Sequence, residues 1–240
     1  MTGGRRRPST TAGHSWQVGG VKKVWIRLSV LANVLVLVGI LYLLLGSPFR
    51  DLLHPFMTQE AVSFFAAYPV EDGDIVFVGD SITAGAQWNE MFPQHPVRNR
   101  GIGGDRTDDI LRRFDQLVVG PPEKIFLKIG TNDLGTGVDE AVIVENYAEI
   151  LDRFARGAPS AQIHVQSLLP REAGYRLQVE RLNASLAALA AERDFVFVDL
   201  YPSFLDEDGS IRDELSPDEL HLSGAGYRLW QQQLTPFVDS

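Results

Sequence analysis

The clearest constraint on the fold is an alternation of two kinds of segment from Glu71 onward. Short runs rich in β-branched and aromatic residues alternate with longer amphipathic stretches of helical periodicity. Strands separated by helices usually lie parallel in one sheet, with helices on both faces. The pattern therefore predicts a three-layer α/β/α domain over residues 71–240, with a central parallel sheet of about five strands. The expected strands cover residues 74–79, 97–102, 124–130, 162–169 and 195–200.

The amphipathic stretches predict the helices of this domain. Three helices are expected at about residues 107–117, 139–156 and 175–193. A last helix should begin near Ser223, because a serine hydroxyl often caps the first free backbone N–H groups of a helix. A short helix is also expected around residues 58–67, within a connector that covers residues 47–70.

An apolar run without charge covers residues 28–46 and precedes the predicted domain. Extended back to Val24, it reaches the roughly 20 residues that span a bilayer core. Basic residues crowd its N-terminal side, whereas Arg50 on the other side is followed at once by Asp51. This asymmetry predicts a cytoplasmic N-terminus. We therefore expect a single-pass transmembrane helix over residues 24–46, with the domain outside the cytoplasm.

A cleaved signal peptide is the alternative reading of this region, because it also has a basic segment before an apolar core. The run is longer than the usual core of a signal peptide, and its end lacks a good small-x-small cleavage site. We favour an uncleaved anchor. Residues 1–23, rich in Gly, Ser, Thr and Arg, are expected to form a disordered, cytoplasmic basic tail.

Charge and cysteine content exclude several classes of function. The chain carries 31 acidic against 22 basic residues, and its formal net charge is −9. The basic residues of the first 27 positions have no acidic neighbours, so the remainder is more acidic still. An acidic domain repels phosphate backbones, which argues against nucleic acid as a partner. The absence of cysteine excludes disulfides, thiolate metal ligands and a cysteine nucleophile.

Glycines and polar residues collect where the expected strands end. In an open parallel sheet, ligands bind beyond the carboxyl ends of the strands, so these positions are the first candidates for a site. The first three strands are followed by G-D-S, G-I-G-G-D and G-T-N-D, and D-E-L-H follows the last strand after a loop. The residues of catalytic type at these points are Ser81, Gly104, Asn132, Asp218 and His221.

Ser81 becomes a useful nucleophile only if a base takes its proton, and histidine is the usual base because its pKa lies near neutrality. His221 is the best placed of the five histidines. The other four lie in the tail, in the connector, before a strand and within a strand: His14, His54, His95 and His164, respectively. Asp218 can reach the second ring nitrogen of His221, because it lies three residues earlier, within one turn.

Two further residues are candidates for stabilising a transition state. Attack on an ester carbonyl develops negative charge on oxygen, so hydrogen-bond donors fixed in advance lower the barrier. Gly104 allows a close approach of its backbone N–H, and Asn132 offers a side-chain amide. Together with the N–H of Ser81 they would form a three-donor oxyanion hole, in which removal of one donor typically costs about 3 kcal/mol.

The segments G-D-S-I, G-I-G-G-D, G-T-N-D and D-x-x-H, in this order, resemble the four blocks of the SGNH hydrolases, also called the GDSL-like family. The resemblance covers about residues 74–230 and implies a flavodoxin-like α/β/α fold. It also implies one nucleophile, two oxyanion donors and an acid–base pair: Ser81, then Gly104 and Asn132, then Asp218 and His221. The segment N-R-G-I-G-G-D is similar to the branch of platelet-activating-factor acetylhydrolase-like and sugar-ester esterases.

This resemblance implies a serine ester hydrolase that needs neither a metal nor an organic cofactor. The expected substrate is a small-molecule or glycan ester with a short acyl group, such as O-acetyl, or a lysophospholipid. More than one substrate stays open because fold and triad do not determine the acyl or the alcohol part. Asp80, Asp105 and Asp133 are expected to accept hydrogen bonds within their loops, and a metal site made of these three is less favoured. Arg106 departs from the small residue or threonine that is frequent in the family.

Three other readings stay open. An O-acyltransferase would use the same triad but pass the acyl group to a sugar hydroxyl. A catalytically silent, membrane-tethered binding module would keep the fold without an activated serine. An α/β-hydrolase fold is disfavoured, because its nucleophile motif G-x-S-x-G would need a glycine where this chain has Thr83.

Overall fold

The computed structural model describes residues 18–44 and 46–240, and it divides into two compact units, residues 1–50 and 51–240. The larger part of the predicted tail, residues 1–17, lies outside the described residues. The helix of the first unit, α1, runs from Val18 to Leu44 and so begins within the segment predicted to be a tail.

Apolar side chains of α1 are solvent-exposed; Leu28, Leu35 and Leu37 are each more than half exposed. Among the described residues, no helix is both long enough and apolar enough to cross a membrane. The transmembrane helix predicted over residues 24–46 is thus not confirmed.

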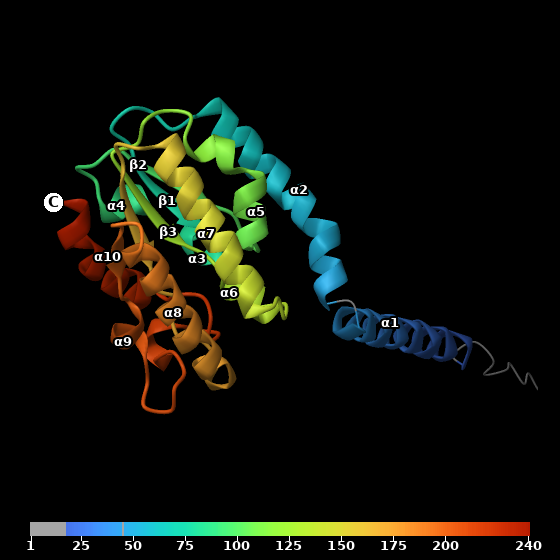
Figure 1. The fold of residues 1–240 in the computed structure, drawn as a ribbon. Helices are drawn as coiled ribbons and strands as arrows, with labels where there is room; N and C mark the ends of the chain where they lie inside the picture. Colours follow the sequence, from blue (N-terminus) through green and yellow to red (C-terminus); the bar gives the residue numbers. More distant parts are fainter. Residues whose placement is uncertain (1–17, 45) are drawn as a thin grey trace, which may run out of the picture. The chain divides into compact units, whose positions relative to one another are not determined.

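The second unit is built on one sheet of five parallel strands in the order β2-β1-β3-β4-β5 (Figure 1). This confirms the predicted three-layer fold with a central parallel sheet. The strands are β1 Ile75–Gly79, β2 Val97–Gly101, β3 Lys124–Lys128, β4 Gln162–Gln166 and β5 Val196–Val198. Four strands end earlier than predicted. After β3, for example, Gly130 has φ of 118°, which lies outside the strand region and turns the chain.

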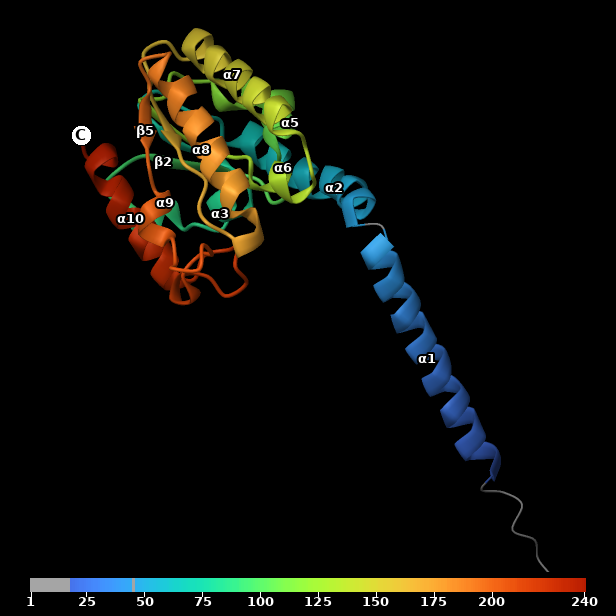
Figure 2. The ribbon, with the colours of Figure 1, turned by 60° about the horizontal axis from the view of Figure 1, so that its bottom comes forward.

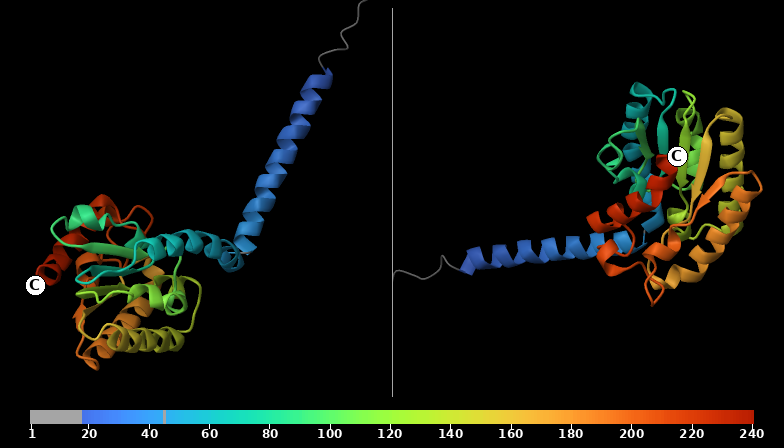
Figure 3. Two further views of the ribbon diagram at one scale, coloured as in Figure 1. Left: turned by 90° about the horizontal axis from the view of Figure 1, so that it is seen from above. Right: turned by 90° about the vertical axis from the view of Figure 1, so that its left-hand side faces the viewer.

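Helices cover both faces of the sheet, because alternate strand residues point to opposite sides. The helices of the second unit are α2 Gly46–Ala67, α3 Ser81–Ala84, α4 Trp88–Met91, α5 Thr107–Arg112, α6 Thr131–Gly135, α7 Glu140–Gly157, α8 Arg176–Ala191, α9 Tyr201–Phe204 and α10 Gly224–Val238, of which α2 begins in the first unit. In the right-hand view of Figure 3 the strands lie between the red helix α10 and the yellow and orange helices α7 and α8.

Two apolar clusters fill the space between the layers. On one face, Val76 and Ile125 pack with buried residues of α5, α7 and α8. On the other face, Phe77 and Phe126 pack with residues of α4, α9 and α10. In Figure 2, α5 and α7 lie on the opposite side of the strands from α10. Trp88 illustrates the second cluster, since its ring stacks on Phe77 at 3.6 Å between centroids.

Helix boundaries agree with the sequence patterns for α7, α8 and α10 and differ for α5 and α2. Ser223 caps α10 as predicted, because its hydroxyl accepts a hydrogen bond from the N–H of Gly226. The predicted helix over 107–117 is α5 followed by a 3₁₀ turn, Phe114–Leu117. The connector helix α2 extends to Gly46, well before the predicted start at residue 58.

The carboxyl ends of β1, β2 and β3 lie level with one another in the sheet. Candidate site residues follow each of these three strands. Gly79, the last residue of β1, pairs with Gly101 at the end of β2 and with Lys128 at the end of β3. The loops that follow these strands therefore leave the sheet at one edge. Residues far apart in sequence can meet there.

Candidate active site

Ser81 is the first residue of α3, directly after β1. Asp80 caps this helix, because its Oδ1 accepts a hydrogen bond of 2.9 Å from the N–H of Ile82. The turn needs Gly79, since a Cβ there would lie 2.2 Å from the Oγ1 of Thr83 and 2.3 Å from the carbonyl oxygen of Lys128. Close packing of these elements fixes the backbone that carries the Ser81 hydroxyl.

His221 and Asp218 lie on the loop before α10. The side chain of His221 contacts Ser81, and the side chain of Asp218 contacts His221. The Oγ of Ser81 lies 3.0 Å from Nε2 of His221, and Nδ1 of His221 lies 2.8 Å from Oδ2 of Asp218. The structure thus brings together the three residues that the sequence pattern singled out. Their arrangement is that of a nucleophile, a base and an orienting carboxylate.

The Asp218 loop is held by its own carboxylate. Oδ1 of Asp218 accepts hydrogen bonds from the N–H groups of Leu220 and His221, and Glu219, which directly follows Asp218, has φ of 58°. The hydrogen bond from the His221 ring is the main cause that lowers the pKa of Asp218. Asp218 is therefore ionised at neutral pH and suited to stabilise an imidazolium.

The candidate triad is open to solvent. The side chains of His221 and Asp218 are 44% and 51% exposed, respectively. Helix α10 nevertheless holds the nucleophile region, because the hydroxyl of its Tyr227 donates to the carbonyl oxygen of Ile82 over 2.9 Å. A large alcohol group could reach this triad, and so could water.

The two predicted oxyanion donors lie on loops that are tied to each other. Gly104 adopts φ of 80°, a conformation that favours glycine. The Nδ2 of Asn132, in α6, donates a hydrogen bond of 2.8 Å to the carbonyl oxygen of Asp105. A side-chain amide carries two donor hydrogens, so one remains for a substrate oxygen. A second tie joins the same loops, because Asp133 accepts hydrogen bonds from the backbone N–H and the hydroxyl of Thr107.

The three loop aspartates act as hydrogen-bond acceptors, as their positions predicted. Burial is the main cause that raises the pKa of Asp133 to about 6, against the hydrogen bonds from Thr107. Burial also raises the pKa of Asp105 to about 6, against the charge of Arg113. Within the described residues, the side chains able to share one metal ion are His54, Asp105 and Asp109, so Asp80 and Asp133 are not part of that group.

Sequence reasoning missed Lys128, which ends β3 and pairs with Gly79 of β1. Its side chain is wholly buried, and its Nζ has no hydrogen-bond partner among the described residues. The ring of Trp230 lies 5.5 Å from Nζ. Desolvation lowers the pKa of Lys128, and the carboxylate of Asp80 opposes this. The available signal was the strand sequence K-I-F-L-K, which has a lysine at each end of an apolar run.

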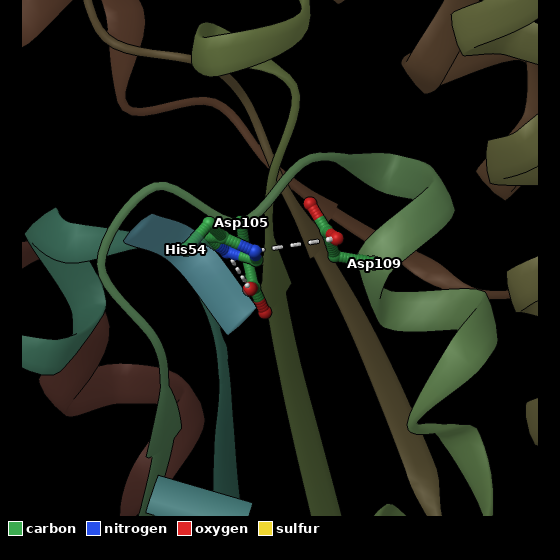
Figure 4. A group of neighbouring side chains, drawn as sticks. All are labelled: His54, Asp105 and Asp109. Atoms are coloured by element: carbon green, nitrogen blue, oxygen red, sulfur yellow. Dashed lines mark hydrogen bonds and ion pairs between the residues drawn. The ribbon is translucent and has the colours of Figure 1, made fainter. Parts of the chain in front are cut away.

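The remaining histidines are separate from the triad. His164 is buried in β4, and Nε2 of His95 lies 2.8 Å from Oδ1 of Asp239. His14 lies outside the described residues. His54 of α2 contacts Asp105 with its Nε2 at 3.0 Å (Figure 4), which nothing in the sequence pattern predicted.

Comparison with known proteins identifies the family. The sequence model of the GDSL-like lipase/acylhydrolase family matches residues 77–229. Platelet-activating factor acetylhydrolase IB subunit alpha1 of Pongo abelii is 31% identical over 174 residues, covering 68% of this chain and 74% of that protein. The chain therefore belongs to the GDSL-like lipase/acylhydrolase family, the SGNH hydrolases, and is a carboxylic ester hydrolase.

Solved structures agree with this assignment. A Streptococcus pneumonia structure described under the name platelet activating factor is 28% identical, with a TM-score of 0.72 over 78% of this chain and 97% of that one. The acetyl xylan esterase AlAXEase has a TM-score of 0.61 at 21% identity, covering 69% of this chain and 99% of that one. The second likeness concerns the fold alone.

Proposed function

We propose that the chain hydrolyses short-chain carboxylic esters through an acyl-enzyme on Ser81. The observation that carries the proposal is the continuous hydrogen-bonded chain from Ser81 through His221 to Asp218, with distances of 3.0 and 2.8 Å. His221 takes the proton of Ser81 as Oγ attacks the ester carbonyl, and it then gives that proton to the departing alcohol. Water releases the acyl group in the same way, with His221 again as base.

The oxyanion would be held by three donors: the N–H groups of Ser81 and Gly104, and the second amide hydrogen of Asn132. Support comes from the loop ties at Asp105 and Asp133, which restrict both loops before any substrate binds. Donors that need no rearrangement stabilise the developing charge most effectively.

We propose a short acyl group, such as acetyl, on a small-molecule or glycan alcohol. The exposed triad leaves room for a bulky alcohol, and the acetylhydrolase relatives act on an acetyl group by name. Exposure also favours hydrolysis over transfer, because a transferase has to keep water from the acyl-enzyme. A lysophospholipid is the second candidate substrate.

The first experiment compares the full-length chain with Ser81→Ala on p-nitrophenyl acetate, butyrate and a long-chain ester. Ser185→Ala is the matched control, because Ser185 lies on α8 with its hydroxyl bonded to the carbonyl oxygen of Arg181. We expect hydrolysis and fluorophosphonate labelling in the wild type and the control, and neither in Ser81→Ala. Equal rates in all three proteins would contradict the proposal, and labelling with acyl transfer to an added sugar would favour the transferase.

The location is a proposal from sequence. The apolar run over residues 28–46 and the basic residues before it support attachment to a membrane, with the enzyme domain outside the cytoplasm. Fractionation of cells that express the full chain, followed by protease treatment of intact cells, tests this. A chain found wholly in the soluble fraction would contradict it.

A further inference from the structure

His54 connects helix α2 to the loop that follows β2. Its Nε2 lies 3.0 Å from Oδ1 of Asp105, and its Nδ1 lies 3.8 Å from Oδ1 of Asp109 (Figure 4). His54 is 9% exposed and Asp105 is wholly buried. The family match begins at residue 77, so this contact comes from a part of the chain that precedes the matched region.

Asp105 links the two segments that carry Gly104 and Asn132, the proposed oxyanion donors. It directly follows Gly104, and its carbonyl oxygen accepts the hydrogen bond from the Asn132 amide. Its carboxylate is held from a second side by Arg113, whose Nε lies 2.7 Å from Oδ2. Arg113 in turn donates to the carbonyl oxygen of Arg100 at 2.7 Å, at the end of β2. His54 closes the remaining side of this carboxylate.

A metal ion is the competing explanation for this cluster, since the ligand atoms of His54, Asp105 and Asp109 lie within 4.8 Å of one another. Both carboxylates already pair with guanidinium groups, Asp105 with Arg113 and Asp109 with Arg112. A dication would lie close to two cations and would compete with Arg112 for Oδ1 of Asp109. The donor set therefore favours a hydrogen-bonded clamp over a metal site.

We infer that His54 is a positioning residue for ester hydrolysis, because it fixes Asp105 and through it the backbone of Gly104 and the amide of Asn132. The inference rests on the proposed function. The donors act on charge that develops in the transition state, so loss of the clamp lowers kcat and changes KM little. Residues 51–67 of α2 are thereby part of the catalytic apparatus rather than a passive connector.

The test compares His54→Ala with His54→Gln, whose amide can still donate to Asp105. His95→Ala is the matched control, since it removes another histidine–aspartate pair of 2.8 Å, before the start of β2 and away from the carboxyl ends of the strands. We expect kcat on p-nitrophenyl acetate to fall about tenfold in His54→Ala, less than the 10²–10³-fold that loss of a whole donor costs. His54→Gln should regain most of this loss, and His95→Ala should keep wild-type kcat.

Hydrogen–deuterium exchange provides a readout that does not depend on activity. Backbone amides of residues 102–107 should exchange faster in His54→Ala than in the wild type and the control. Unchanged exchange in this segment would overturn the inference, whether or not the wild type is active. An inactive wild type would by itself count against the proposed function only. Faster exchange with unchanged kcat would overturn the link to catalysis. Zinc-dependent recovery of activity in chelator-treated wild type would overturn the clamp in favour of a metal site.

Discussion

The stability of the domain should depend on pH through His164, which β4 buries in the apolar core. Its ring stacks on Phe126 with 4.4 Å between centroids and meets the edge of Phe237. Its Nδ1 has no hydrogen-bond partner among the described residues. Burial is the main cause that lowers the pKa of His164 to about 4, and the nearby charge of Lys124 adds to it, against a backbone hydrogen bond at Gln162.

The size of the effect follows from the two pKa values of His164. The unfolded chain binds a proton at an ordinary pKa of about 6.5, whereas the folded protein does so only near 4. Between these values the unfolded state holds more protons, so stability increases as pH rises and falls as pH drops. At about 1.4 kcal/mol per pKa unit, the full loss between pH 7 and pH 4 approaches about 3 kcal/mol.

His164→Phe keeps an aromatic ring in the stack and removes the titrating group. Urea unfolding of the full chain, followed by tryptophan fluorescence between pH 4 and pH 7, gives the free energy of unfolding. We expect the variant to gain up to about 3 kcal/mol on the wild type as pH falls through this window. Contributions from other groups, including Asp105 and Asp133, cancel in the difference. Ile163→Val, a core change without a titrating group, should differ from the wild type by a constant amount.

A constant difference between His164→Phe and the wild type across the whole window would refute the reasoning. It would mean that the His164 ring binds its proton equally well in the folded and unfolded states. Burial against Phe126 would then not exclude the charged form.

Three further predictions concern the site. Asn132→Ala should lower kcat by about 10²–10³-fold with little change in KM, measured on p-nitrophenyl acetate, because it removes a donor made for the transition state; a change confined to KM would speak against that role. Asp218→Asn should lower kcat by roughly 10²–10⁴-fold while fluorophosphonate labelling slows in parallel, since the neutral amide no longer stabilises the imidazolium; undiminished labelling would exclude Asp218 as the partner of His221. Gly79→Ala should lower the free energy of unfolding by about 1–3 kcal/mol in a urea titration, because its Cβ would overlap the Oγ1 of Thr83 and the backbone of Lys128; wild-type stability would contradict the tight packing there.

The sheet and the proximity of Ser81, His221 and Asp218 were predictable because their signals are local. Most strands contain a short run of β-branched or aromatic residues, such as I-V-F-V in β1, and parallel strands place their carboxyl ends at one edge. Residues that directly follow those ends, such as Ser81 and Asn132, could therefore be placed together from sequence alone. Asp218 and His221 were predictable because three residues separate them, which is within reach of one turn.

Contacts between distant segments could not be predicted. His54 and Asp105 are 51 residues apart, and neither α2 nor the loop carries a pattern that indicates the partner. The short helices α3 and α6 were missed, because four or five residues do not establish a helical period. Burial of Lys128 was missed for a different reason: a lysine at a strand end usually reaches solvent, and only packing against Trp230 shows that it does not.

The lysines of this chain are Lys22, Lys23, Lys124 and Lys128, so the domain over residues 51–240 holds only two, exposed by 1% and 0%. Reagents that acylate or methylate amines therefore meet no accessible lysine side chain on the folded domain. The amine of Lys128 can react only when the packing around the end of β3 opens locally and exposes it to solvent. The rate at which the Lys128 amine is modified would therefore report how often this region opens in the native protein, without an introduced probe.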